Sequence, residues 1–273
     1  MIEFDLTRET LRALVDEWHE AAAADSITMR TREHMLIGLT VYGLVAHVYT
    51  LTEAVMLLDE KGRQQAALPL VRQAIECGYT AVWLELAGYP AVLTMLREQT
   101  RQQRNVIDAF VRSGQAPNAE STARLNEELE RALKSATAAG EKFEQRCREL
   151  VGGDQIYAMY RAASHTSHAG TAVVDLYLES ARIGEIGARG AALRDTPKAD
   201  SFEPWMSMLL VALVHATAAW SRIDARRTAR TRMKSLAKEV GTTPHLQLSS
   251  AGFLMKQQRQ REYEAWRKTV DDS

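Results

Sequence analysis

Residues 35–58 read MLIGLTVYGLVAHVYTLTEAVMLL, and this stretch decides the fold because it is apolar on nearly every face of a helix. A helix that is apolar all round is either buried in a protein core or spans a membrane. The length fits both, but His47 and Glu53 would be costly in lipid, and no other segment could pair with this one. We therefore expect a central buried helix and no membrane span.

Helical patterns extend on both sides of this central stretch. Only 6 prolines and 15 glycines interrupt the 273 residues, and few β-branched alternations occur, so nearly all of the chain is predicted to be helical. The further predicted helices span about 7–24, 68–88, 91–112, 119–151, 155–182, 201–240 and 250–268.

Two of the remaining segments have a predicted role in the architecture. Residues 119–151 carry apolar positions at near-heptad spacing, so they should pair with the preceding helix as an antiparallel hairpin arm. Residues 183–203 contain three glycines and Pro197, which predicts a long loop. The expected fold class is all-α: one domain over residues 1–273, built as a multi-helix bundle with a long helical hairpin and a basic C-terminal helix.

The net charge of −1 conceals a marked asymmetry. Residues 1–204 hold 22 Lys and Arg against 29 Asp and Glu, whereas residues 205–273 hold 12 against 6. In the basic extension 222–273, three arginines recur at i, i+4 and i+8 and a fourth lies beside them: Arg222, Arg226, Arg230 and Arg227. Such a stripe predicts a cationic face for nucleic-acid phosphates, although a solvated helix end with cations near its C-terminal dipole explains it equally well.

The polar cluster of the sequence is residues 157–168, YAMYRAASHTSH. On a helix, Arg161 and His168 are two turns apart on one side, and Ser164 and His165 are their i,i+4 neighbours. We expect these four side chains to converge on one patch, with Tyr160 beside them.

A second polar pair, Arg72 and Glu76, lies beside the apolar stripe of the helix predicted over 68–88. The spacing i,i+4 predicts a structural salt bridge at the edge of the core.

Metal and cofactor sites are not predicted. His165-x-x-His168 could meet His47 and His215 across three helices, but single histidines in apolar helices more often satisfy a hydrogen bond in the core. The sequence contains no Gly-rich phosphate loop, no Gly-x-Ser-x-Gly and no Glu-x-x-His pair, so nucleoside triphosphatases, elbow hydrolases and di-iron proteins lack their signatures.

The location of the protein is predicted from its cysteines and its N-terminus. Cys77 and Cys147 lack metal-ligand spacing and fit buried thiols in a reducing compartment. The first residues, MIEFDL, have neither the basic nor the apolar region of a secretory signal. We therefore expect a cytoplasmic protein.

The motif Ala67-Leu-Pro-Leu-Val-Arg72-x-x-x-Glu76, followed by Tyr160-Arg-x-x-Ser164-x-x-x-His168, resembles the bacterial helical family catalogued as domain of unknown function 5677. The resemblance covers roughly residues 35–182. It implies a helical bundle and no settled activity.

More distantly, Ser164-His-Thr-Ser-His168-Ala-Gly resembles the catalytic helix of the higher-eukaryote and prokaryote nucleotide-binding (HEPN) domains. This resemblance implies a metal-independent ribonuclease, often a homodimer, that belongs to a defence system. His168 matches the catalytic histidine and Ser164 the polar residue beside the arginine. At the arginine's usual position stands Ala163, so Arg161 would have to replace it at the widest permitted spacing.

The chemistry of RNA cleavage suits these residue types. Attack by the RNA's own 2′-hydroxyl needs a proton acceptor with a pKa near neutrality and a cation for the charge on phosphate, roles suited to His168 and Arg161. Tyr160 and His165 could position the phosphate. We therefore expect an RNA-directed, defence-linked protein, with ribonuclease activity as the hypothesis to test.

Two alternatives stay open. In the first, the protein is a non-catalytic interaction module, and Arg72 and Glu76 meet Tyr157, Ser164 and His168 in a polar network that fixes helix register. In the second, the bundle binds a metal ion or a small molecule.

Overall fold

The computed structural model describes residues 4–24, 28–30, 35–114, 123–124, 127, 140–165, 170–183, 188–198, 201–227 and 229–271. These residues form an almost entirely helical protein, so the predicted all-α bundle is confirmed. In chain order the elements are α1 (Phe4–Ala23), α2 (Met35–Glu60), α3 (Gln64–Ala87), α4 (Tyr89–Arg112), α6 (Phe143–Arg148), α7 (Gly153–His165), α8 (Thr171–Asp175), β1 (Leu178–Ile183), β2 (Ala188–Leu193), α9 (Glu203–Ile223), α10 (Arg230–Glu239) and α11 (Ser250–Asp271).

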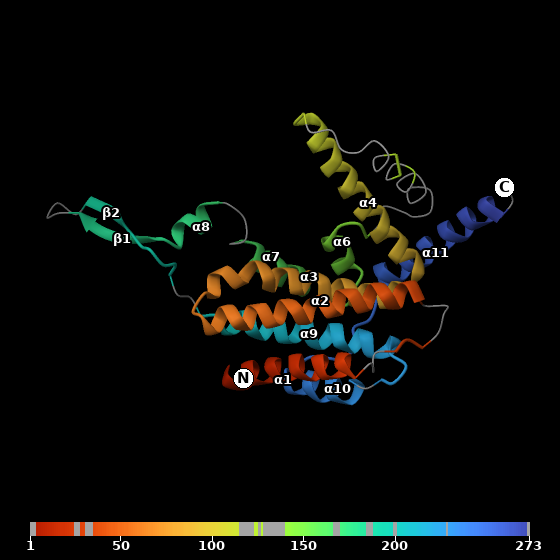
Figure 1. Cartoon of the computed structure of the whole chain (residues 1–273), viewed down its shortest axis with the longest axis horizontal. Coiled ribbons are helices and arrows are strands. Elements are labelled where there is room, and N and C mark those ends of the chain that lie inside the picture. Colours follow the sequence, from red (N-terminus) through yellow and green to blue (C-terminus); the bar gives the residue numbers. More distant parts are fainter. Residues whose placement is uncertain are drawn as a thin grey trace.

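The centre of the bundle is formed by α2, α3 and α9, which run side by side (Figure 1). The apolar stretch 35–58 lies within α2, so the predicted central helix is confirmed, and its Val41, Val45 and Val48 are fully buried. A short turn at residues 61–63 leads into α3, which packs along α2 and against α9. Gly78 permits the close approach of α3 to α9, because a Cβ there would lie 3.2 Å from the carbonyl oxygen of Ala212.

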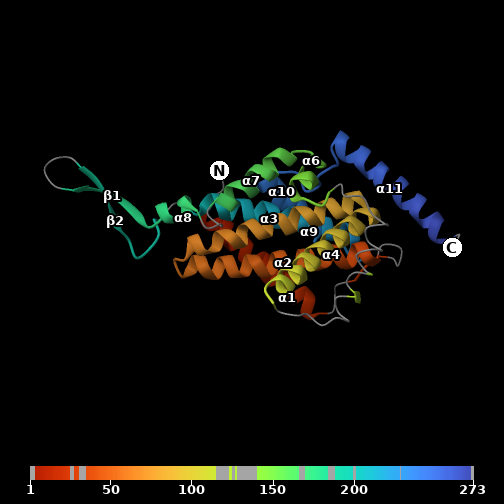
Figure 2. The same ribbon diagram turned by 90° about the horizontal axis from the view of Figure 1, so that it is seen from above.

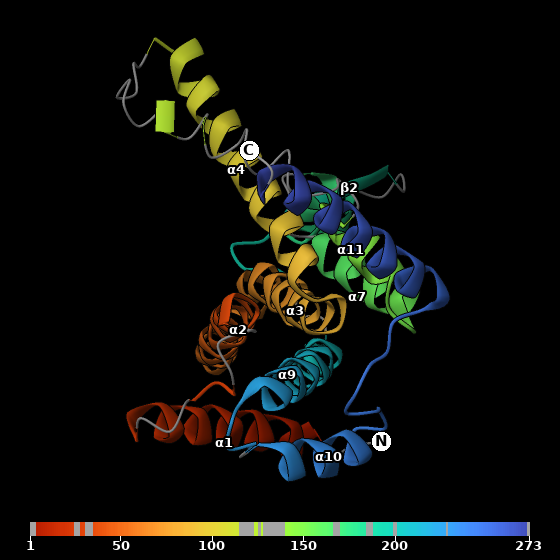
Figure 3. The ribbon, with the colours of Figure 1, turned by 90° about the vertical axis from the view of Figure 1, so that its right-hand side faces the viewer.

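Outer helices cover this centre on two sides. α1 and α10 pack on the side of α9 that faces away from α3, as the end-on view in Figure 3 shows. On the other side, α6 and α7 pack against α3. The helix α7, which carries the polar cluster of the sequence, therefore lies on α3 and not next to α1 or α10.

Two parts of the molecule project from opposite ends of the bundle. At one end α4 diverges from α3 and contacts α11, which continues outward to the C-terminus (Figure 2). At the other end lies the antiparallel hairpin β1–β2, in which Leu178 pairs with Leu193 and Ile183 with Ala188.

The prediction of one helix over 155–182 is wrong in its second half. α7 ends at His165, and the chain continues through the short α8 into β1. The predicted loop 183–203 is wrong for the same reason, because it contains β2 and the first residue of α9. Apolar residues at helical spacing in 173–177 suggested a continuous helix, but local periodicity does not exclude a strand when the hairpin partner lies further along the chain.

The predicted helix over 201–240 is also broken. Asp224 leaves the helical conformation with φ −57° and ψ 129°, and residues 224–229 separate α9 from α10. Asp224 forms an antiparallel bridge with Met29, and the Ala225 N–H donates a hydrogen bond to the carbonyl oxygen of Thr28 at 2.8 Å. Pairing with this distant segment replaces the helical hydrogen bonds at this point.

The predicted hairpin arm 119–151 lies largely outside the described residues. Within it the structure describes residues 123–124, 127 and 140–151, which include α6.

Among the described residues, α2 and α9 are long and apolar enough to cross a membrane. In the bundle, 44% of the most apolar window of α2 and 72% of that of α9 are buried. Core helices of globular proteins pass the same test, so length and composition are weak evidence for a membrane span.

Candidate functional site

The start of α7 is fixed by a close contact with α6. A Cβ on Gly153 would lie 1.7 Å from the carbonyl oxygen of Cys147, so only glycine fits there. Gly152, with φ +75°, makes the preceding turn in a conformation that favours glycine. Ile156 and Ala163 are the buried positions further along α7, and they hold this helix against the bundle.

One face of α7 is tied to α3 through Arg72. The Arg72 Nε donates a hydrogen bond to Ser164 Oγ at 2.9 Å, and its Nη2 donates to the Tyr160 hydroxyl. The guanidinium also lies 4.8 Å from the centroid of the Tyr160 ring, which adds a cation–π contact. Arg72 thus clamps two residues of the polar cluster in place.

The predicted pair of Arg72 and Glu76 is present, with 3.7 Å between Nη2 and Oε2. The two side chains are 26% and 36% exposed, so solvent screens their attraction. Tyr157 stacks near Tyr160 with 6.0 Å between ring centroids. Of the network considered from the sequence, the Arg72–Glu76 pair and the contact between Arg72 and Ser164 are present. Tyr160 is an additional partner of Arg72, and Tyr157 contacts Tyr160.

The other face of α7 turns outward. Arg161 and His165 are exposed, whereas Tyr160 and Ser164 are half-buried against α3. The structure therefore separates these four side chains into an inner pair and an outer pair, because residues one apart on a helix point about 100° away from each other. His168, the fifth residue of the predicted site, lies outside the described residues, as do its neighbours 166–169.

A polar hollow of about 440 Å³ opens beside the Arg72 network. It lies between α2, α3, α4, and α6 with the segment before it. The side chains that give it its chemistry are charged or carry amides. These are Arg72, Gln73, Glu76, Glu98, Gln99, Gln102, Glu141 and Arg146. A pocket with this lining can hydrogen-bond a polar ligand from several directions.

Arg146 is a residue of this hollow that the sequence analysis missed. Its guanidinium donates hydrogen bonds to the carbonyl oxygens of Gly140 and Glu141, each at 2.8 Å, and to Thr80 Oγ1 at 3.1 Å. Burial lowers the pKa of this guanidinium, but an arginine keeps its charge at physiological pH. Arg146 follows Phe143 by three residues, so the two side chains share the inward face of α6. This spacing was the feature of the sequence that could have indicated the burial of Arg146.

The cysteines near this site are poor nucleophiles. Burial raises the pKa of the Cys77 thiol, which lines the hollow, to about 11. Burial likewise raises the pKa of Cys147 to about 12. Both thiols are therefore protonated at neutral pH, whereas nucleophilic chemistry needs a deprotonated thiolate.

The histidines considered as metal ligands lie in different surroundings. His47 is exposed and its Nε2 lies 3.1 Å from Gln73 Nε2. His215 is buried, with Nε2 at 2.8 Å from the Thr243 carbonyl oxygen and Nδ1 at 3.2 Å from the Tyr79 hydroxyl. In the part of the chain that the structure describes, no group of three or more His, Cys, Asp or Glu residues could hold a metal ion.

The four arginines of the predicted cationic stripe do not share one helix. Arg222 lies in the last turn of α9 and pairs with Glu85 at 2.6 Å. Arg226 and Arg227 are exposed in the segment between α9 and α10, where Arg227 has a positive φ of 54°. Arg230 begins α10 and is half-buried. The predicted helical spacing of this stripe is therefore wrong, because the helix ends at Ile223.

The family comparison places the candidate site in a known sequence family. The model of the family of unknown function DUF5677 matches residues 39–185, which include α3, α7 and all residues of the Arg72 network. No curated protein and no solved structure matches the chain. Because the family model covers more than half of the chain, this protein belongs to the DUF5677 family.

Proposed function

We propose that the protein acts on RNA as a metal-independent ribonuclease related to the HEPN domains, in a defence-linked role. Arg161, His165 and His168 would contact the phosphate. The observation that supports this proposal is the exposure of Arg161 and His165 at the end of α7, three residues before His168. A cation and an imidazole that face solvent are accessible to a polynucleotide, whereas a buried pair would not be.

The reaction would use the RNA's own 2′-hydroxyl. His168 accepts the 2′-hydroxyl proton, and the 2′-oxygen then attacks phosphorus. The bond from phosphorus to the 5′-oxygen breaks, and that oxygen takes up a proton from solvent while a 2′,3′-cyclic phosphate forms. Arg161 stabilises the charge that develops on the phosphate oxygens.

The inner residues would support this patch without contacting RNA. Arg72 holds Tyr160 and Ser164, so it fixes the rotation of α7 and with it the direction of Arg161. Ala163, at the usual position of the arginine, is fully buried. A cation at that position would face the core, and Arg161 is the accessible replacement on this turn.

Purified protein incubated with a broad panel of labelled RNAs tests the proposal. We expect wild type to cleave, and His168→Ala or Arg161→Ala to lower the rate at least about a hundredfold with unchanged circular dichroism. His47→Ala, which removes another exposed histidine, is the matched control and should cleave like wild type. Wild type that is inert toward every RNA contradicts the proposal.

The same preparations test the basic segment. We propose that Arg226 and Arg227 add phosphate contacts, because both are exposed, while Arg222 is held by Glu85. Replacing Arg226 and Arg227 with Gln should flatten the salt dependence of RNA binding by up to about two phosphate contacts. A salt slope that survives this double replacement removes the segment from the interface.

A homodimer and a cytoplasmic location complete the proposal. The HEPN resemblance implies a homodimer, and in such a dimer two copies would bring their α7 patches to one RNA. The free thiols of Cys77 and Cys147 fit a reducing compartment. Light scattering of the purified protein measures the dimer directly, and a monomer at all concentrations would contradict it. Fluorescence microscopy of a tagged protein tests the location.

The Arg72 network favours one further candidate, a non-catalytic interaction module. Its hydrogen bonds join α3 to α7, and a polar network of this kind can serve to fix helix register alone. This function would apply if wild type is inert and His168→Ala lowers the melting temperature instead of a rate. The polar hollow beside Arg72 would then be the place to look for a small ligand.

A further inference from the structure

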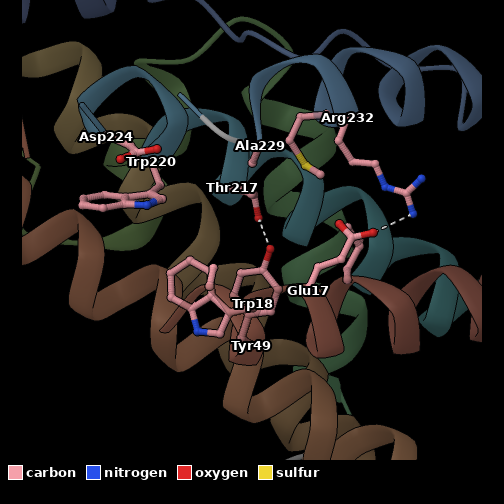
Figure 4. A pocket seen from close by; sticks show the side chains of 11 residues that line it. Glu17, Trp18, Tyr49, Thr217, Trp220, Asp224, Ala229 and Arg232 are labelled. Carbon is pink, nitrogen blue, oxygen red and sulfur yellow. Dashed lines mark hydrogen bonds and ion pairs between the residues drawn. The ribbon is translucent and has the colours of Figure 1, made fainter. Parts of the chain in front are cut away.

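The polar hollow beside Arg72 has the size of a small-molecule site. Its volume of about 440 Å³ falls within the roughly 300–1,000 Å³ of known ligand pockets. A second pocket, between α1, α2, α9 and α10, measures only about 160 Å³ (Figure 4). In that pocket Glu17 pairs with Arg232, and the Tyr49 hydroxyl pairs with Thr217. The hollow is larger, and two of its charged groups keep hydrogen-bonding capacity that the described residues do not use.

The first of these groups is the guanidinium of Arg146, which lines the hollow although the residue is only 8% exposed. A guanidinium carries one N–H on Nε and two on each terminal nitrogen. The Nε donates to the Gly140 carbonyl oxygen, Nη1 to Thr80 Oγ1 and Nη2 to the Glu141 carbonyl oxygen. One N–H therefore remains on each terminal nitrogen. All three acceptors are neutral, and no described carboxylate forms a salt bridge with this guanidinium, so an anionic group would find an unpaired cation here.

The second group is the carboxylate of Glu76. Its Oε2 lies 3.7 Å from Arg72 Nη2, and it accepts no hydrogen bond from any residue that the structure describes. Glu76 and Thr80, the partner of Arg146, are one turn apart on α3, which corresponds to about 6 Å along the helix axis. Burial lowers the pKa of Arg146, and the charges of Glu76 and Glu98 act in the opposite direction. The guanidinium and the carboxylate thus influence each other across the hollow without forming an ion pair.

This pair of groups selects a class of ligand. An anion at Arg146 would be repelled by Glu76 and Glu98, and a cation at Glu76 would be repelled by the two arginines of the hollow. A molecule that carries both charges close together can donate to the carboxylate and accept from the guanidinium at the same time. We propose that the hollow binds a free α-amino acid, with its carboxylate at Arg146 and its ammonium group at Glu76.

The rest of the lining indicates the kind of side chain that the amino acid carries. Gln73 of α3 and Gln99 and Gln102 of α4 bring three amide groups to the hollow. An amide both donates and accepts hydrogen bonds, so it suits a ligand side chain that does both. The amide of free glutamine or asparagine and the hydroxyl of free serine have this property. The proposal does not rest on RNA cleavage, because these contacts involve no part of the exposed face of α7.

Calorimetric titration of the full chain with L-glutamine, L-asparagine and L-serine tests the proposal. Two derivatives of each are the matched controls: the methyl ester lacks the carboxylate charge, and the N-acetyl derivative lacks the ammonium charge. We expect at least one of the three amino acids to bind, and both of its derivatives to bind at least about tenfold more weakly. No binding of any of the three at millimolar concentration overturns the proposal, as does a derivative that binds as tightly as its parent.

Variants then assign the binding to the hollow. Glu76→Gln keeps the shape and removes the charge, and it should weaken binding of the amino acid at least about tenfold. Glu60→Gln, which removes a carboxylate that pairs with Arg12 outside the hollow, should bind like wild type. Arg146→Gln should also weaken binding, whereas Arg148→Gln, on the exposed side of the same helix, should not. If Arg146→Gln does not fold, Glu76→Gln decides the question alone. Unchanged affinity in folded Glu76→Gln overturns the assignment, whether or not the protein cleaves RNA.

Discussion

Arg72 is the residue on which the arrangement of the candidate site depends most directly. It combines two hydrogen bonds, an ion pair and a cation–π contact in one half-buried guanidinium. Only a planar fork of donors can reach Ser164 and Tyr160 together while it lies over a ring. The guanidinium geometry of Arg72, and not its charge alone, is therefore what holds α7 on α3.

Arg72→Lys is predicted to separate the fork from the charge. Lysine can keep the ion pair with Glu76 but cannot make both hydrogen bonds, so we expect the free energy of unfolding to fall by about 1–2 kcal/mol. Urea unfolding measures this loss, and the exposed Arg104→Lys on α4 should change it by less than about 0.5 kcal/mol. Tyr160→Phe introduced into wild type and into Arg72→Lys gives the coupling energy between Arg72 and Tyr160. Additive effects of the two changes would mean that the contact between these side chains does not stabilise the protein.

The sequence predicted that four residues of the candidate site share one helix, but it did not predict how their side chains divide between its two faces. Helical spacing placed Tyr160, Arg161, Ser164 and His165 on one helix, and α7 contains all four. It could not indicate that α3 would take Tyr160 and Ser164, because the partner of a helix face depends on tertiary packing. Arg146 was missed for a related reason: a charged residue is expected to be exposed until the fold supplies carbonyl oxygens for it.

At the scale of elements, the long buried helices were predictable and their interruptions were not. The apolar stretch of α2 is long and uniform enough to outweigh its two polar residues, His47 and Glu53, and the observed bounds differ from the prediction by two residues. The break at Asp224 depends on residues 28–30, nearly two hundred positions earlier. Similarly, β1 and β2 are strands because they pair with each other. The local sequence pattern of either segment alone therefore could not predict a strand.

Two glycines in neighbouring helices provide a test of how α3 meets α9. At Gly78 an added methyl would lie 3.2 Å from the Ala212 carbonyl oxygen, whereas at Gly43 on α2 it would have nothing within 4 Å. Gly78→Ala should therefore destabilise the protein by about 1–3 kcal/mol through overpacking. Gly43→Ala should stabilise it by about 0.5–1 kcal/mol, because alanine is the better helix former. Denaturant unfolding of both variants measures the contrast, and a stabilised Gly78→Ala would disprove the close approach.

At the scale of the whole molecule, His215 links the fold to pH. It lies in α9 at the centre of the bundle, and burial lowers its pKa below the ordinary value of about 6.5. Between about pH 6.5 and the lower folded-state pKa, His215 binds a proton in the unfolded chain but not in the folded protein. The free energy of unfolding should consequently fall as the pH drops below about 6.5, until the folded-state pKa is reached.

His215→Gln tests this linkage. Unfolding midpoints measured between about pH 8 and pH 5 should decline less steeply in this variant than in wild type, whatever its stability at pH 8. His47→Gln removes an exposed histidine from α2 and should keep the wild-type slope. Parallel curves for wild type and His215→Gln would show that the buried imidazole does not drive the effect.

The place of α9 in the chain has a consequence for synthesis. This helix contacts α1, α2, α3 and α10, yet it begins only at Glu203. Until the ribosome has made α9, α2 and α3 can pair, but the surface that α9 will cover stays open to water. Such apolar surface on a nascent chain attracts chaperones and other unfinished chains. The arrest of translation before α9 would leave a fragment prone to aggregate, and that surface would be covered only after α9 had been made.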